Sequence, residues 1–410
     1  MPTRASLAAL AAVLALPACA TARPERTPAP TPPTAQSTTQ RTTQPPSTSP
    51  PTTPTTTAAP PTTPAPILSR AERALAGMSL AQRVGQLFMV DCPSSGVIQA
   101  TVNAITRFHV GSVILDGTSR LSRDQTAAIT AQLQQQAPRG LGLFIATDQE
   151  GGLVQRMQGP GFSSIPSAVA QGGLAPSVLR AEAQQWGAEL RAAGVNVDLA
   201  PVLDTVPPDF GGNPPIGDLD REYGRDPATV ASHGVAVAQG LAAAHIDATV
   251  KHFPGLGRVA GNTDVSSGVL DTVTTRHDRY LAPFAAAIRA GVPFVMMSTA
   301  IYTDIDPDRP AAFSPTVVTG MLRQDLGFTG VIISDDIGIA TQVSGYSIGG
   351  RAVAFIAAGG DMVLTVDAGQ APQMTAAVLA RANADRHFRA QVNAAALVVL
   401  RAKQAAGLLR

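Results

Sequence analysis

Charged and hydrogen-bonding side chains stand at or directly after the ends of several short apolar runs in this sequence. They are Asp148, Asp198, Lys251, His252, Asp335 and Asp367. Random surface polarity would not follow the ends of apolar runs in this way. Carboxylates beside lysine, arginine and histidine can match the donors and acceptors of a hydroxyl-rich ligand such as a sugar. We therefore expect a carbohydrate-binding site where these run ends come together.

Other site chemistries and partners find less support in the sequence. No H-E-x-x-H motif is present, and the six histidines are scattered along the chain. Only His252 ends an apolar run, and the others are expected on helices, at strand starts or in connections: His109, His233, His245, His277 and His387. We therefore expect no metal and no other cofactor. The formal net charge of +1 gives no reason to expect a nucleic acid as partner.

Eight apolar runs, alternating with Ala-rich helical stretches, must position these side chains. The runs are 85–91, 110–115, 142–147, 195–199, 246–251, 294–298, 331–334 and 362–366, and the clearest helical stretches are 181–193, 228–244 and 280–290. Strands that are apolar throughout are buried on both faces, which is typical of a parallel sheet. Eight strand–helix units predict a closed barrel, and no G-x-G-x-x-G follows the first run, which argues against a dinucleotide-binding fold.

We therefore predict an α/β fold, a single (β/α)8 barrel of the TIM type over residues 67–410. An early helix should begin at Ser79, because Ser79 and Gln82 have the spacing of a capping box. In such barrels the C-terminal strand ends share one face, where function resides. The run ends described above should therefore form one site.

The first 66 residues have a different composition. Residues 1–18 combine Arg4 with a short apolar core, as in a signal peptide, and the core is shorter than the roughly 20 apolar residues of a membrane span. The segment Leu16-Pro17-Ala18-Cys19 is similar to a bacterial lipobox, so Cys19 is expected to carry a lipid. Ordinary cleavage and a free secreted protein are the alternative. Residues 19–66 are mostly Thr, Pro, Ser, Ala and Gln, which predicts a disordered linker. We expect an exported protein that contacts the outer face of the membrane only through its lipid.

Longer motifs surround the polar run ends. They are Asp148-Gln149-Glu150-Gly151-Gly152 with Gln155-Arg156, Arg221-Glu222-Tyr223-Gly224, Lys251-His252-Phe253-Pro254-Gly255 and Val331-Ile332-Ile333-Ser334-Asp335-Asp336. In this order they resemble the motifs of glycoside hydrolase family 3, in its bacterial β-N-acetylglucosaminidase group. The resemblance extends from about residue 70 to the end of the sequence.

The resemblance implies a function for each matching residue. Asp335 matches the family's nucleophile, which attacks the anomeric carbon and forms a covalent glycosyl-enzyme with retention of configuration. Five residues match positions that hold the hydroxyls of the terminal sugar: Asp148, Arg156, Arg221, Lys251 and His252. Asp336 is expected to support the nucleophile. The implied substrate is a glycan with terminal N-acetylglucosamine, such as a peptidoglycan fragment, with a β-glucosidase-type activity as an alternative.

The general acid departs from the family pattern. The group uses a histidine backed by an aspartate on a mobile loop. Here Ser266 occupies the position of the aspartate and Gly268 the position of the histidine. Asp264 or another loop carboxylate is one candidate substitute, and we favour Asp264. A second reading is an enzyme for leaving groups that need little protonation. A third is an amino-sugar-binding cell-wall lipoprotein that has lost most of its catalytic power.

Overall fold

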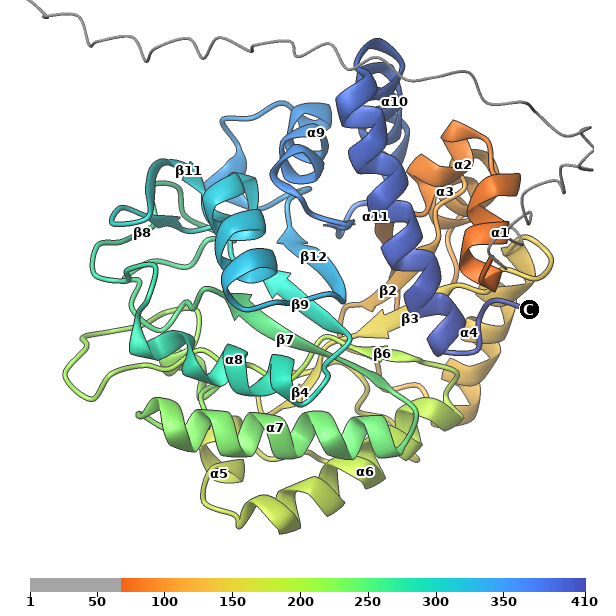
Figure 1. The fold of residues 1–410 in the computed structure, drawn as a ribbon. Coiled ribbons are helices and arrows are strands. Elements are labelled where there is room, and N and C mark those ends of the chain that lie inside the picture. Colours follow the sequence, from red (N-terminus) through yellow and green to blue (C-terminus); the bar gives the residue numbers. More distant parts are fainter. Residues whose placement is uncertain (1–67) are drawn as a thin grey trace, which may run out of the picture. The chain divides into compact units, whose positions relative to one another are not determined.

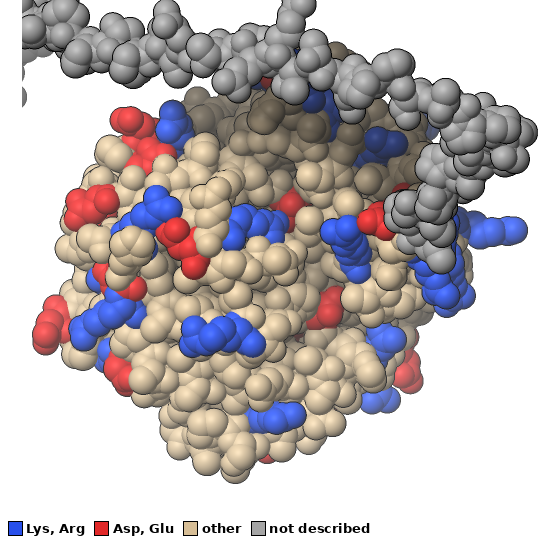
Figure 2. Space-filling model, in the orientation of Figure 1, with Lys and Arg blue, Asp and Glu red and all other residues tan. Residues whose placement is uncertain are grey.

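The computed structural model describes residues 68–410 (Figure 1). The predicted signal peptide, the lipidation site Cys19 and the linker lie outside the described residues. Within the described part, no helix has both the length and the apolar character needed to cross a membrane. Basic and acidic side chains are interspersed on the face shown in Figure 2.

The predicted parallel barrel is confirmed. Eight strands close in the order β1-β13-β12-β9-β7-β6-β3-β2, and every neighbouring pair is parallel. They are β1 (Phe88–Pro93), β2 (Ser112–Asp116), β3 (Phe144–Thr147), β6 (Val197–Asp198), β7 (Asp247–Phe253), β9 (Phe294–Met297), β12 (Val331–Asp336) and β13 (Met362–Thr365). Each of the eight predicted runs therefore contains or overlaps one barrel strand.

The first strand begins later than predicted. Gly85 ends the helix α2 (Leu80–Gly85), which starts at the predicted capping box of Ser79 and Gln82. A Cβ atom at Gly85 would lie 2.4 Å from the carbonyl oxygens of both Phe108 and His109, so this close contact requires glycine. A further helix, α1 (Arg70–Gly77), precedes α2 and begins with a capping box of its own.

Helices surround the barrel (Figure 1). They are α3 (Gln99–Phe108), α4 (Arg123–Gln136), α5 (Ala168–Gln171), α6 (Pro176–Ala192), α7 (Pro227–Ala243), α8 (Ala282–Arg289), the π-helical segment η4 (Thr316–Asp325), α9 (Ile348–Ala358), α10 (Ala371–Ala384) and α11 (Arg386–Ala405). The predicted stretches 181–193, 228–244 and 280–290 correspond to α6, α7 and η2 (Arg279–Leu281) with α8. Pro176, Pro227 and Pro283 stand in the first turns, where a proline costs no helical hydrogen bond.

A buried lysine lies at the end of the barrel where the strands begin. The Nζ atom of Lys403, on α11, donates to Gln86 Oε1 at 2.8 Å and to the Gly111 carbonyl at 2.7 Å. It also lies 5.7 Å from the centre of the Phe144 ring. Burial lowers the pKa of Lys403 to about 7. Two neutral acceptors and a ring face therefore take the place of a counter-ion.

The opposite end of the barrel has the longer loops. A hairpin of β4 (Gln149–Gly151) and β5 (Val154–Gln155) follows β3, and a small sheet of β8 (Leu270–Asp271), β10 (Ile301–Tyr302) and β11 (Asp306–Pro310) lies outside the barrel. The hydroxyl of Tyr302 donates to the Gly255 carbonyl at 2.8 Å and so supports the turn after β7. Of these elements, the hairpin contributes Val154 to the lining of the candidate site.

Candidate active site

The C-terminal ends of the strands surround a pocket of about 440 Å³, within the size range of small-molecule sites. All seven residues predicted for binding and catalysis line it: Asp148, Arg156, Arg221, Lys251, His252, Asp264 and Asp335. They come from the ends of β3, β7 and β12 and from the loops that follow the strands. The structure thus brings together residues that the sequence distributes over almost 190 positions.

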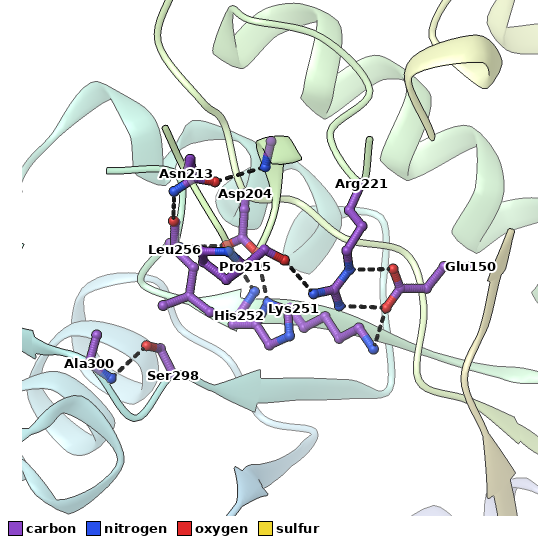
Figure 3. A network of polar contacts seen from close by, with 12 residues as sticks. Glu150, Asp204, Asn213, Pro215, Arg221, Lys251, His252, Leu256, Ser298 and Ala300 are labelled. Atoms are coloured by element: carbon purple, nitrogen blue, oxygen red, sulfur yellow. Dashed lines mark hydrogen bonds and ion pairs between the residues drawn. The ribbon is translucent and has the colours of Figure 1, made fainter. Parts of the chain in front are cut away.

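Lys251, at the end of β7, is held between two carboxylates. Its Nζ atom lies 2.6 Å from Asp148 Oδ1. It also lies 2.7 Å from Glu150 Oε1 (Figure 3). Burial alone would lower the pKa of Lys251, but the two carboxylates outweigh this effect and raise it. The ammonium group therefore stays charged and fixed at the pocket wall.

Glu150 is a central residue of the site that the sequence interpretation did not single out. It accepts two hydrogen bonds from Arg221, from Nε at 2.8 Å and from Nη2 at 2.7 Å (Figure 3). Burial alone would raise the pKa of Glu150, but Arg221 and Lys251 hold it well below its usual range. Arg221 also donates to the Pro215 carbonyl at 2.7 Å, so the loop after β6 fixes its direction.

Asp198, at the end of β6, lies buried beneath this network. It accepts a hydrogen bond from the Gln149 N–H at 3.0 Å. Burial, followed by the negative charges of Asp148 and Glu150, raises the pKa of Asp198 to about 8, despite the opposing effect of Lys251. The positive charges of Lys251 and Arg221 already balance the negative charges of Asp148 and Glu150. The neutral acid form of Asp198 therefore prevails at pH 7.

His252 is oriented by Asp204, a second residue to which the sequence interpretation gave no individual role. The ring atom Nδ1 lies 2.7 Å from Asp204 Oδ2, while Oδ1 accepts from the backbone N–H groups of His252 at 3.1 Å and Leu256 at 2.8 Å (Figure 3). A carboxylate only accepts, so Nδ1 carries the proton of this contact. In neutral His252 the other nitrogen, Nε2, is then free to accept from a ligand.

Asp335 and Asp336 end β12 but are held differently. Asp336 accepts from the backbone N–H groups of Gly338 at 2.9 Å, Ile339 at 3.2 Å and Val366 at 3.2 Å, and burial raises its pKa to about 6. Asp335 accepts only the N–H of Asp336, at 2.9 Å, among the described residues. The carboxylate of Asp335 is therefore the freer of the two, while Asp336 braces the loop that follows β12.

Arg156 lines the pocket without a close partner. Its Nη2 atom is 3.8 Å from Asp116 Oδ1, beyond hydrogen-bonding distance, and its buried Nε has no partner among residues 68–410. The guanidinium group thus retains free donors for a ligand.

Asp264 lies on the loop after β7 and also lines the pocket. Burial of the carboxyl group and the negative charge of Asp335 raise the pKa of Asp264 to about 6, although the residue as a whole is exposed to solvent. His252 and Arg221 act in the opposite direction. This carboxyl group can hold a proton in weak acid and still exchange it with water.

The described residues contain neither a metal-binding cluster nor a serine-hydrolase elbow. No group of three or more His, Cys, Asp or Glu side chains in residues 68–410 is placed to hold a metal ion. The segment Gly345–Gly349 has the G-x-S-x-G spacing of serine hydrolases, but the Ser347 hydroxyl accepts the Gly350 N–H at 3.2 Å and caps α9. The pocket itself is lined by the carboxyl groups of Asp116, Asp148, Asp264, Asp335 and Asp336.

Comparison with known proteins agrees with this geometry. The sequence model of the glycosyl hydrolase family 3 N-terminal domain matches residues 79–402. The β-hexosaminidase of Xanthomonas campestris is 39% identical over 266 residues, covering 62% of this chain and 76% of that protein. The crystal structure of a β-N-acetylhexosaminidase from Beutenbergia cavernae is 51% identical, with a TM-score of 0.79, and the match covers 80% of this chain and 99% of that one.

A second solved structure is more distant. The family 3 β-N-acetylglucosaminidase of a Paenibacillus species is 32% identical, with a TM-score of 0.76, over 81% of this chain and 63% of that one. The family match alone spans most of the described residues, including every side chain that lines the pocket. The chain therefore belongs to glycosyl hydrolase family 3.

Proposed function

We propose that the chain is a retaining β-N-acetylhexosaminidase that releases terminal N-acetylglucosamine through a covalent glycosyl-Asp335 intermediate. Relatives with hexosaminidase names support the activity. The observation that carries the mechanism is the pairing of two carboxyl groups in one pocket, where Asp335 is held by a single neighbouring N–H and Asp264 has a raised pKa. Retaining glycosidases need one carboxylate as nucleophile and one acid.

In the first step, a carboxylate oxygen of Asp335 forms a bond to the anomeric carbon while the glycosidic C–O bond breaks. The leaving oxygen takes its proton from Asp264. In the second step, Asp264 removes a proton from water, and the water oxygen displaces Asp335 from the anomeric carbon. Because the charge of Asp335 contributes to the raised pKa of Asp264, formation of the glycosyl ester lowers that pKa and favours the base form needed next.

The polar wall holds the terminal sugar. Asp148, Lys251 and Arg221 supply fixed donors and acceptors, and Arg156 supplies donors that no described side chain uses. His252, with its ring fixed by Asp204, offers Nε2. A set of fixed donors and acceptors around a pocket recognises the positions of the hydroxyl groups of a sugar.

The natural substrate and location follow from the same proposal. A peptidoglycan-derived fragment fits the exported, Cys19-anchored protein that the first residues predict. A lipidated chain would work outside the membrane, on glycans within reach of its linker.

The decisive experiment uses 4-nitrophenyl N-acetyl-β-glucosaminide with the wild type and Asp335→Asn. The wild type should release nitrophenol, and the variant should lose this activity almost completely while still binding N-acetylglucosamine. NMR should show the β-anomer of the sugar as the first product. A first product of α configuration would refute retention, and activity that survives in Asp335→Asn would refute the nucleophile.

One observation favours a second candidate, a sugar-binding protein with little catalysis. Ser266 and Gly268 stand where the family has its aspartate and histidine, and neither side chain can replace the histidine. If this candidate holds, ligands bind but neither the wild type nor Asp335→Asn shows measurable hydrolysis. Faster cleavage of the aryl β-glucoside than of the N-acetylglucosaminide would instead indicate a β-glucosidase.

A further inference from the structure

Two loops at the mouth of the pocket are joined by Gln342. One loop follows β7 and carries Asp264, and the other follows β12 and carries the turn η5 (Thr341–Val343). The Gln342 side chain is 9% exposed, whereas Asp264 and Val265 are exposed to solvent. A buried residue of one loop thus packs against a segment of the other loop that is exposed around Asp264 and Val265.

Gln342 holds both ends of the segment 263–269. Its Oε1 accepts the Val269 N–H at 2.9 Å, and its Nε2 donates to the Val269 carbonyl at 3.2 Å. Its own backbone N–H donates to the Thr263 carbonyl at 3.0 Å, and the N–H of Thr341 donates to the Asp264 carbonyl at 3.0 Å. Thr263 and Val269 are both buried, so the segment is fixed at its two ends and exposed between them.

We infer that Gln342 is a positioning residue, which holds Asp264 in a fixed place over the pocket relative to Asp335. The inference rests on the proposed role of Asp264 as acid and base. Asp264 and Gln342 lie in separate loops. The turn η5, which contains Gln342, begins only five residues after Asp336, in the loop that follows the nucleophile strand β12. The backbone N–H groups of Thr341 and Gln342 therefore tie Asp264 and Thr263 to the segment that follows the nucleophile strand, and the side chain of Gln342 fixes the other end of the same segment at Val269.

Loss of these bonds should affect proton transfer more than binding. A displacement of about 1 Å can cost roughly 100-fold in rate when a catalytic group must be aligned. The sugar-binding residues Asp148, Lys251 and Arg221 are held by one another and by other loops, without bonds to Gln342. A disturbed Gln342 should consequently impair substrates that depend on the acid.

The test compares Gln342→Met, which keeps the side-chain length but removes both hydrogen-bonding atoms, with Gln134→Met. Gln134 is a matched control because it makes the same pair of bonds to one backbone residue, accepting from Leu143 N–H and donating to the Leu143 carbonyl, each at 3.0 Å. Leu143 precedes β3, at the end of the barrel away from the pocket. Both variants lose equivalent bonds, but only one of them borders the proposed acid.

Two substrates separate the steps. Phenyl N-acetyl-β-glucosaminide has a poor leaving group that needs a proton, and the 2,4-dinitrophenyl compound has a good one that does not. For Gln342→Met we expect kcat/KM on the phenyl compound to fall roughly 10- to 100-fold, with less than about 3-fold change on the dinitrophenyl compound. Gln134→Met should change neither value by more than about 3-fold on this reasoning.

The pH profile supplies a readout that a purely structural role would not move. The charged groups that act on Asp264 are Asp335, Asp148, His252 and Arg221. In the wild type, activity on the phenyl compound should decline as Asp264 loses its proton near pH 6. In Gln342→Met this limb should move to lower pH, because a loosened Asp264 is less buried and further from Asp335. Gln342→Glu keeps an acceptor for Val269 and should restore part of the rate.

Each outcome decides the inference. Equal losses on both substrates, or losses in Gln134→Met as large as in Gln342→Met, would overturn it. If Gln342→Met does not fold, as judged by thermal unfolding, Gln342→Glu must show the same substrate dependence in milder form, or the inference fails. Asp264→Asn tests the underlying function separately. If Asp264→Asn shows no preference for good leaving groups, Asp264 is not the acid and the inference about Gln342 is refuted as well. Asp335→Asn would still test the nucleophile independently.

Discussion

The buried carboxylate of Glu150 allows a quantitative test of the site's electrostatics. Glu150→Gln keeps the size of the side chain but removes the negative charge between two cations. The side chains of Glu150 and Lys251 are 5% and 3% exposed, and that of Arg221 is 14% exposed. Removing one partner of a buried ion pair typically costs about 3–5 kcal/mol. Because Asp148 still faces Lys251 and the pocket admits water, we expect about 3 kcal/mol, at the low end of that range.

The assay is urea unfolding followed by circular dichroism, with Asp325→Asn as the control. Asp325 also binds an arginine through two hydrogen bonds, to Arg276 at 2.7 and 3.0 Å, but this pair lies at the surface. Its loss should change the free energy of unfolding far less. Activity of Glu150→Gln should also fall, because Arg221 and Lys251 lose their fixed directions.

The pH dependence of this difference follows from the sign of the pKa shift. The pKa of Glu150 is lowered by folding, so its contribution is present above the unfolded value of 4.5 and is lost as the pH falls below it. The gap between wild type and variant should therefore be constant from pH 6 to 8 and narrow in more acidic buffer. A gap no larger than that of Asp325→Asn, at pH 7, would refute the reasoning.

Three further substitutions test other groups. Asp204→Asn should lower kcat/KM roughly 10- to 100-fold, because a hydrogen bond to a charged group is worth about 1.5–3 kcal/mol. Its loss also leaves the His252 ring without a fixed proton position. Unchanged kinetics would show that the ring needs no orientation. Folding raises the pKa of Asp198 to about 8, so the contribution of this group to stability should be lost as the pH rises from about 4 to 8. Asp198→Asn cannot ionise and should therefore gain stability relative to the wild type between pH 5 and pH 9, which urea unfolding at the two pH values checks. Folding lowers the pKa of Lys403 from 10.5 to about 7, so the contribution of this group to stability should be lost as the pH falls through this interval. The stability of Lys403→Met relative to the wild type should therefore improve between pH 10 and pH 7. A difference that does not vary with pH would contradict the lowered pKa.

The barrel and the membership of its pocket could be predicted from the sequence because both follow from local patterns. Apolar runs such as 142–147 and 331–334 are long enough to identify buried strands, and the residues that follow them must share one face of a closed barrel. The start of β1 was placed too early for a local reason. Only the two turn residues Gln86 and Leu87 separate the short helix α2 from the strand, and neither is a residue type that marks a turn in a sequence.

The contacts of Glu150 and Asp204 were not accessible in the same way. The partner of Glu150 is Arg221, 71 positions later, and the partner of Asp204 is His252, 48 positions later. Such pairings depend on how the loops after separate strands meet, which a single sequence does not specify. The only available signal for Glu150 was its position two residues after Asp148 in the same motif.

The bonds between Gln342 and the segment 263–269 also bear on how this site can be redesigned. A family-type acid loop grafted into positions 256–269 alone would leave the buried amide of Gln342 facing a foreign backbone, with a donor and an acceptor unsatisfied. The segment 337–344 would have to be transplanted with it. The two segments, joined through residues that are 73 positions apart in the chain, are thus a single exchangeable part for protein engineering.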